Sequence, residues 1–242
     1  MRKGKNKFEL LERIKINYKR HGIFHILKSG LEFLYWRYLK QQRTFTFHGD
    51  IYSYFYHWYN TTWKNERCVE IPIIMKIINS CKGKRVLEVG NVLSHYFSSK
   101  HDIVDKYEKA PGVINRDVVD FKPSKKYDLI VSISTLEHVG WDEKPKEEQK
   151  TLYALKNLKK CLVAKGQMII TFPLGENPFL DKLFKEDKLC FTELYCLKHT
   201  GSKWIEISLS QIDWNEIHNN FHQKRYTKYL IIGYYKKVDK NE

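Results

Sequence analysis

The chain has 242 residues, 42% of them hydrophobic, which suits one domain of ordinary size with an extension and makes disorder a poor description. Its five cysteines are scattered without a Cys-x-x-Cys pair, and its ten histidines lack metal-ligand spacing, so we predict no disulfide framework and no metal site. The formal net charge of +15 is concentrated in residues 1–43, with 12 Lys and Arg against 3 Asp and Glu. The apolar stretch 23–39 is interrupted by charges and no signal-peptide pattern is present, so we expect a cytoplasmic protein.

The first 64 residues form a predicted extension ahead of a domain at 65–242. Apolar residues spaced three or four apart predict two amphipathic helices over 8–40, broken near His21-Gly22. Such a basic, amphipathic segment fits a docking face for the core, a helix on an anionic membrane surface or a nucleic-acid arm. Residues 44–63 are dense in aromatic side chains around the turn His48-Gly49-Asp50, which predicts a short hairpin or lid.

The remaining residues alternate between strand and helix patterns. We expect a helix at 66–80, with Pro72 in its first turn or kinking it, a helix-like segment at about 92–99, and a helix at about 145–162 that Gly166 would end. Expected strands lie at 84–89, 101–105, 113–117, 127–133, 167–172, 191–199, 203–208 and 228–236. Alternating βα units followed by a strand-rich end predict an α/β fold, a Rossmann-like, doubly wound, mostly parallel sheet with an antiparallel C-terminal edge.

Acidic residues follow several of these strands in order. Glu88 lies in the first strand before the turn Gly90-Asn91, Asp105 ends the second and Asp117 follows the third. Ligands of open parallel sheets bind beyond the carboxyl ends of the strands, and an acid there can accept hydrogen bonds from a ribose diol. A dinucleotide turn needs three glycines near the pyrophosphate, whereas this turn has only Gly90. A cofactor without phosphates, S-adenosylmethionine, fits better.

The order Glu88-x-Gly90, Val104-Asp105, Arg116-Asp117-Val118 and 127–139, which reads Tyr-Asp-Leu-Ile-Val-Ser-Ile-Ser-Thr-Leu-Glu-His-Val, resembles the class I S-adenosylmethionine-dependent methyltransferases over about 65–236. In the fourth-strand segment the resemblance is to the branch that methylates small molecules, lipids and sugars. The resemblance implies that Glu88, Gly90 and Asn91 hold the methionine end of the cofactor and that Asp105 holds its ribose. It also implies that Asp117 and Val118 face the adenine, and that Ser132 and Ser134 form the floor of the pocket. The family's second and third glycines are replaced by Val92 and Ser94-His95.

Other readings of these residues remain open. Glu108 could accept the ribose in place of Asp105, and Asp120 could replace Asp117. His138 is the candidate general base, because it follows the fourth strand and imidazole changes charge near neutral pH. Candidate acceptor contacts are Arg67, which could instead anchor the extension through Glu66 and Glu70, and, after the fifth strand, Gly175, Asn177 and Asp181.

The sequence leaves three candidate functions open. The first is O-methylation of a sugar or glycan intermediate, suggested by the resemblance and by the aromatic residues of 52–63. The second is methylation of RNA, with the basic N-terminus holding phosphates. The third is a non-catalytic scaffold that binds the cofactor. We also expect residues 1–43 to contact an anionic membrane peripherally.

Overall fold

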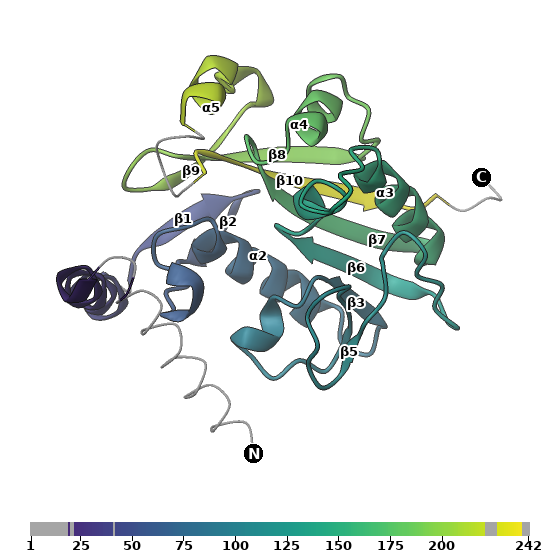
Figure 1. Cartoon of the computed structure of the whole chain (residues 1–242), viewed down its shortest axis with the longest axis horizontal. Helices are drawn as coiled ribbons and strands as arrows, with labels where there is room; N and C mark the ends of the chain where they lie inside the picture. Colours follow the sequence, from purple (N-terminus) through teal and green to yellow (C-terminus); the bar gives the residue numbers. More distant parts are fainter. Residues whose placement is uncertain (1–18, 20–21, 41, 221–226, 239–242) are drawn as a thin grey trace.

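The structure is a computed structural model that describes residues 19, 22–40, 42–220 and 227–238, without the side chains of 218–220 (Figure 1). The first predicted N-terminal helix therefore lies outside the described residues. Within these ranges we find no helix whose length and apolar character would let it span a bilayer. The boundary predicted between 1–64 and 65–242 stays a prediction.

A single eight-stranded sheet organises the molecule, in the order β5-β4-β3-β6-β7-β10-β8-β9. Its strands are β3 (Val86–Val89), β4 (Asp102–Val104), β5 (Val113–Ile114), β6 (Tyr127–Ile133), β7 (Leu162–Pro173), β8 (Glu193–His199), β9 (Trp204–Ile207) and β10 (Tyr229–Lys236). The first five in this order are parallel, whereas β10 runs antiparallel to both β7 and β8, and β9 antiparallel to β8. The predicted Rossmann-like fold is confirmed, and the strand order reverses between β3 and β6.

Helices cover both faces of this sheet. On one face lies α2 (Arg67–Ser80), together with the hairpin, and on the other lie α3 (Lys150–Cys161), α4 (Pro178–Lys185) and α5 (Trp214–Asn220) (Figure 1). Alternate residues of each strand feed the two cores: in β6, Ile130 packs with the α3 side and Leu129 and Val131 with the α2 side. Short turns η2 (Tyr59–Thr61), η3 (Leu93–His95), η4 (Leu136–His138) and η5 (Leu209–Gln211) join these elements.

The predicted hairpin is confirmed as β1 (Thr44–Phe47) and β2 (Asp50–Ser53). His48 and Gly49 both have positive φ, 49° and 77°, as the tight turn between two twisted strands requires. Of the aromatic side chains that follow, Tyr54, Tyr56 and Trp63 are buried in the α2 core and stabilise the fold, whereas Phe55, Trp58 and Tyr59 are only partly buried.

Pro72 lies inside α2 rather than in its first turn. Proline lacks the N–H that would bond to the carbonyl four residues earlier, that of Cys68. This carbonyl instead accepts a hydrogen bond of 2.9 Å from the backbone N–H of Phe55, which ties the aromatic segment to the helix.

Two helix predictions are wrong in extent. The segment 92–99 forms only the single turn η3, in which the N–H groups of Tyr96 and Phe97 both bond to the Leu93 carbonyl, while the Glu88 carboxylate caps the first N–H groups. The helix expected at 145–162 begins at Lys150, and Gly166 does not end it, since β7 starts directly at Leu162. A Cβ on Gly166 would lie 2.9 Å from the Val163 carbonyl oxygen, so close backbone packing explains this glycine.

The second N-terminal helix is helical over 22–34 and continues as the π-helical turn η1 (Tyr35–Leu39). Its predicted apolar stripe does not dock on the core, because Phe24, Leu27 and Leu31 are 85%, 56% and 68% exposed. Phe33 and Trp36 make the contact with the α2 core instead. The stripe is therefore an outward-facing apolar surface.

Candidate functional site

A cavity of about 90 Å³ lies where the strand order reverses, at the carboxyl ends of β3, β4 and β6. This is the position at which open α/β sheets bind ligands, because the loops on either side of the reversal diverge. The lining comes from five segments: Val89 and Gly90, Val104 to Tyr107, Arg116 to Val118, Thr135, and His138, Val139 and Glu143. Four residues predicted to bind the cofactor, Gly90, Asp105, Asp117 and Val118, are thus brought together, and His138 lies with them.

The turn after β3 explains both Gly90 and Glu88. Gly90 has a φ of +84°, and a Cβ there would lie 2.3 Å from the hydroxyl oxygen of Thr135, so no larger residue fits. Glu88 is fully buried beneath the turn, where its Oε1 accepts hydrogen bonds from the backbone N–H groups of Val92 and Leu93 at 2.9 and 2.7 Å. Its Oε2 lies 2.7 Å from Nε2 of His101. Glu88 therefore shapes the turn and lies outside the cavity lining.

Asp105 is held in place by backbone donors. Its Oδ1 accepts hydrogen bonds from the N–H groups of Tyr107 and Glu108, both at 2.8 Å, and its Oδ2 accepts one from Asn91 at 3.0 Å. The Asn91 side chain donates to Oε1 of Glu108 at 2.7 Å. Asp105 lines the cavity, whereas Glu108 and Asn91 brace the loop beside it.

Asp117 belongs to a cluster of four charges with Glu143, Lys106 and Lys150. Its Oδ2 lies 2.6 Å from Lys150 Nζ and 3.0 Å from Lys106 Nζ, and Lys106 also reaches Glu143 at 2.8 Å. Burial opposes the charged carboxylate, but the hydrogen bonds from Lys150 and Lys106 outweigh it and lower the pKa of Asp117. Val118 is buried beside it, and Asp120, the alternative, is exposed and outside the lining.

His138 lies at the other end of the cavity, on the turn η4. Its Nδ1 is 2.7 Å from Oδ2 of Asp142, and its Nε2 is 3.8 Å from Oε1 of Glu137 and 4.0 Å from Oε2 of Glu176. Glu137 is only 1% exposed, and neither of its carboxylate oxygens receives a hydrogen bond from the residues that the structure describes. Burial raises the pKa of Glu137 well above its usual value.

Arg67 caps the carboxyl end of β6. Its guanidinium donates to the carbonyl oxygens of Ile133 and Ser134 at 2.7 and 3.2 Å, and its Nε lies 3.8 Å from Oε2 of Glu70. Oε1 of Glu70 accepts a hydrogen bond of 2.6 Å from the Ser134 hydroxyl. The Glu70 to Arg67 network is therefore formed. Ser134 and the fully buried Ser132 lie beneath the cavity, outside its lining among the described residues.

The segment after β7 braces the part of the site beside His138. Asn177 caps α4, accepting hydrogen bonds from the N–H groups of Phe179 and Leu180, both at 3.0 Å, and its side-chain amide donates to the Glu137 carbonyl at 2.7 Å. The N–H of Gly175 donates to Oδ2 of Asp181 at 3.0 Å. These residues fix the loop that presents Glu176, which lies between Gly175 and Asn177.

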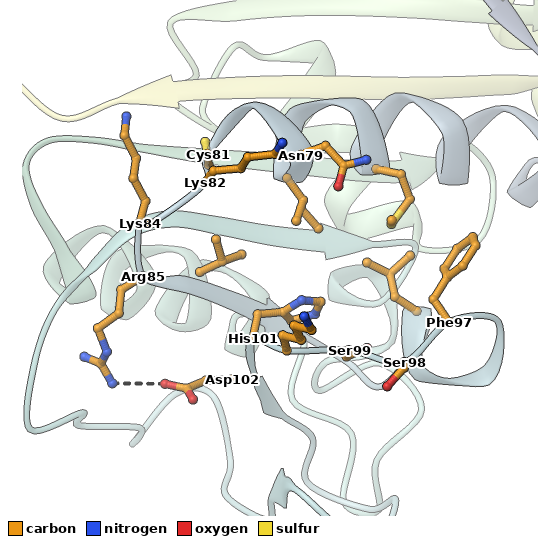
Figure 2. A pocket seen from close by; sticks show the side chains of 16 residues that line it. Asn79, Cys81, Lys82, Lys84, Arg85, Phe97, Ser98, Ser99, His101 and Asp102 are labelled. Carbon is orange, nitrogen blue, oxygen red and sulfur yellow. Dashed lines mark hydrogen bonds and ion pairs between the residues drawn. The ribbon is translucent and has the colours of Figure 1, made fainter.

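A larger cavity of about 460 Å³ lies elsewhere, at the amino ends of β3 and β4. Figure 2 shows it under the C-terminal end of α2, with the 3.0 Å ion pair between Arg85 and Asp102 at its edge. The short crossover with η3 leaves this part of the sheet face uncovered. We assign the functional site to the smaller cavity, because the loops that present side chains to a ligand lie at the carboxyl ends of parallel strands.

Sequence reasoning missed several polar residues of the site, among them Lys106, Tyr107, Thr135, Asp142, Glu143 and Glu176. Lys106 directly follows the predicted acid Asp105, and Thr135 lies within the resembling segment, so position alone could have suggested both. Glu143 and Glu176 carry no such signal, because they meet the site only through the fold.

No protein-family profile and no curated protein matches this chain. Among solved structures it is similar to the N-methyltransferase NodS from Bradyrhizobium japonicum WM9 in complex with S-adenosyl-L-homocysteine, with 11% identity over 72% of this chain and 89% of that one, and a TM-score of 0.45. It is also similar to a 16S rRNA adenine methyltransferase from Catenulisporales acidiphilia with its cosubstrate, with 11% identity, 71% and 93% covered and a TM-score of 0.39. A third is an S-adenosylmethionine-bound amino pentose methyltransferase from Micromonospora echinaspora, with 15% identity, 42% and 48% covered and a TM-score of 0.30.

Proposed function

We propose that this protein transfers a methyl group from S-adenosylmethionine to an acceptor. The observation that carries the proposal is the cavity at the strand-order reversal, where Gly90, Asp105 and Val118 lie together. Gly90 allows the backbone to approach the methionine end, the Asp105 carboxylate accepts the ribose hydroxyls, and the buried Val118 supplies an apolar wall for adenine. This arrangement is supported by Glu88 and Asn91 at the turn after β3, and by Ser132 and Ser134 at the end of β6.

Calorimetric titration with S-adenosylhomocysteine tests the proposal without knowledge of the acceptor. We expect one site per chain, and mass spectrometry of the purified protein to detect bound cofactor or its demethylated product. Absence of binding by both methods would refute the methyltransferase assignment.

We propose a hydroxyl of a sugar or glycan intermediate as the acceptor. His138 borders the cofactor cavity, and Glu137 and Glu176 beside it offer carboxylate oxygens that can accept hydrogen bonds from neighbouring hydroxyls. Arg67, Gly175, Asn177 and Asp181 hold the segments that present these groups. Methyl transfer is an in-line displacement, so alignment of the acceptor hydroxyl with the methyl group supplies much of the acceleration. We propose that the hydroxyl is activated at Nε2 of His138.

Screening with methyl-labelled cofactor tests this choice. Panels of free sugars, nucleotide sugars and lipid-linked glycans form one arm, and total RNA forms the other. Label in a carbohydrate fraction that withstands mild acid is expected for an O-methyl ether. Label in RNA alone would favour nucleic acid as the acceptor.

We further propose that the N-terminal extension contacts an anionic membrane peripherally. Over 22–39 an exposed stripe that includes Phe24, Leu27 and Leu31 lies within residues 1–43, which carry 12 Lys and Arg against 3 Asp and Glu. Apolar insertion and attraction of Lys and Arg to anionic headgroups add together, about 1 kcal/mol for each basic residue near the surface.

Vesicle sedimentation checks this contact. We expect pelleting with anionic vesicles that weakens as salt shortens the Debye length below about 8 Å, and loss of pelleting in Leu27→Ser/Leu31→Ser. Ile51→Ser, which removes an exposed apolar residue of the hairpin, serves as the matched control and should pellet normally. Equal pelleting on neutral vesicles would refute an electrostatic contact.

A further inference from the structure

Three side chains at the acceptor end converge on one point. The ligand atoms of Glu137, His138 and Glu176 all lie within 4.8 Å of one another. They come from two segments, the turn η4 after β6 and the loop after β7, which Asn177 ties together through its hydrogen bond to the Glu137 carbonyl. The convergence is therefore built into the fold rather than produced by neighbours in sequence.

Glu137 is the part of this group that calls for a positive ligand. The carboxylate is almost completely buried, yet neither oxygen receives a hydrogen bond from any other described residue. A buried carboxylate without a donor is costly unless it binds a proton or a cation. Its Oε1 lies 3.8 Å from Nε2 of His138, on the side where Glu176 also approaches.

Asp142 orients the histidine for coordination. Its Oδ2 lies 2.7 Å from Nδ1 and can accept a ring proton there, which leaves Nε2, 3.8 and 4.0 Å from the Glu137 and Glu176 oxygens, as the nitrogen available to a metal ion. A carboxylate on the second ring nitrogen is the usual companion of a metal-bound histidine, because it fixes the tautomer and makes the ligand more basic.

We infer that Glu137, His138 and Glu176 bind a divalent first-row metal ion, such as Mn²⁺ or Fe²⁺. One imidazole and two carboxylates suit such ions, and ligand bonds of about 2.1 Å place neighbouring donors about 3.0 to 3.4 Å apart. The two distances from Nε2 are 3.8 and 4.0 Å and all three donor atoms lie within 4.8 Å of one another, so binding requires the donors to move closer together, a movement that the partly exposed Glu176 side chain can supply. The three protein ligands leave positions for water and for an acceptor hydroxyl.

The role of the ion rests on the proposed methyl transfer. An acceptor hydroxyl bound to the ion loses its proton to solvent more readily, because the ion stabilises the alkoxide. The alkoxide oxygen then forms a bond to the methyl carbon while the carbon–sulfur bond breaks. The electron pair of the broken bond stays on sulfur and gives the neutral thioether. In this scheme Nε2 of His138 holds the ion beside the cofactor instead of accepting the hydroxyl proton itself as a general base, and the proton goes to water.

Metal titration in the absence of cofactor tests this inference separately from methyl transfer. Electron paramagnetic resonance of Mn²⁺ with the full-length protein should show one bound ion per chain. Glu137→Gln and His138→Ala should each weaken binding at least tenfold, and Asp142→Asn should weaken it about 10- to 100-fold through the histidine. Glu148→Gln, which alters a carboxylate paired only with Lys146 among the described partners, should bind as the wild type does.

If the wild type does not bind S-adenosylhomocysteine, the proposed function is refuted, but the proposed metal site is not. Conversely, wild-type protein that binds no Mn²⁺ at millimolar concentration, or Glu137→Gln that binds it as tightly as the wild type, would overturn the metal site. Should Glu137→Gln fail to fold, by circular dichroism, the partly exposed Glu176→Gln replaces it, and unchanged binding there would overturn the site equally.

Discussion

The cofactor end and the acceptor end of this site treat their acidic residues in opposite ways. At the cofactor end Asp105 accepts three backbone hydrogen bonds, and Asp117 lies between two lysines. At the acceptor end Glu137 is buried without a hydrogen-bond donor from any other described residue, and burial raises the pKa of Glu176 although the neighbouring His138 opposes the shift.

At one end the carboxylates already have hydrogen-bond donors within the protein, whereas at the other end Glu137 has none from any other described residue. Carboxylates that already have donors are fixed in the charged form and can present a rigid surface to the cofactor. Carboxylates buried without donors store unfavourable energy that a bound cation or substrate hydroxyl can release. We therefore expect mutations at the two ends to separate cofactor binding from acceptor chemistry.

The largest separation is expected for His138→Ala. With the acceptor found by screening, the single-turnover rate should fall about 10²- to 10⁴-fold, since the group that activates the hydroxyl is lost. Affinity for S-adenosylhomocysteine should stay within a few-fold, because the cofactor end is unchanged. A variant that keeps more than about a tenth of the rate would place the activating group elsewhere, for example at Glu137 or Asp181.

The reverse separation is expected for Asp105→Ala. Loss of two charge-assisted hydrogen bonds to the ribose should weaken S-adenosylhomocysteine binding by about 2 to 4 kcal/mol, measured by calorimetry. Glu108→Ala is the matched control, because Glu108 bonds to Asn91 and lies outside the cavity lining. If Glu108→Ala weakened binding more than Asp105→Ala, the ribose contact would move to Glu108.

The sequence predicted the strands and acidic residues of the cofactor end better than the residues of the acceptor end. The apolar runs at 86–89 and 127–133 and the acids that follow them predict the ligand edge, because parallel strands bring their carboxyl ends together. Glu176 could not be predicted, since it reaches His138 only after β7 pairs with β6 and Asn177 fixes the following loop. The helix expected at 92–99 was wrong for a similar reason: the buried Glu88 carboxylate, and not local propensity, determines that backbone.

Gly90→Ala tests how tightly the cofactor end is built. The new Cβ would lie 2.3 Å from Oγ1 and 2.7 Å from Cγ2 of Thr135, so we expect a loss of about 1 to 3 kcal/mol in the free energy of unfolding and about 10- to 100-fold weaker cofactor binding. Adding Thr135→Ala removes both of those atoms and should restore part of each loss. If the double variant were no better than Gly90→Ala, the positive φ of +84° rather than the contact would account for the glycine.

The smallest effects concern pH, and here Glu66, whose carboxyl group interacts electrostatically with Glu70, Arg67 and Glu176, should differ in sign from Asp117. Burial, reinforced by the neighbouring Glu70 carboxylate, raises the pKa of Glu66 from 4.5 to about 7. The folded chain then binds more protons than the unfolded chain between these values, so Glu66 costs stability as pH rises from about 4.5 to 7. Asp117 has a lowered pKa, so the stability that it contributes is present above its ordinary value of 3.8 and is lost as pH falls below it.

Urea denaturation of Glu66→Gln and Asp117→Asn across pH measures both effects. Relative to the wild type, Glu66→Gln should gain stability from pH 4.5 to pH 7.5, by on the order of 1 to 3 kcal/mol, because the amide removes a carboxylate that folding keeps protonated. Asp117→Asn should be less stable than the wild type at neutral pH, and the difference should shrink below about pH 4. Glu148→Gln should follow the wild type throughout. If the difference between Glu66→Gln and the wild type did not change with pH, the acceptor end would already satisfy this carboxylate, and the contrast between the two ends would be limited to Glu137 and Glu176.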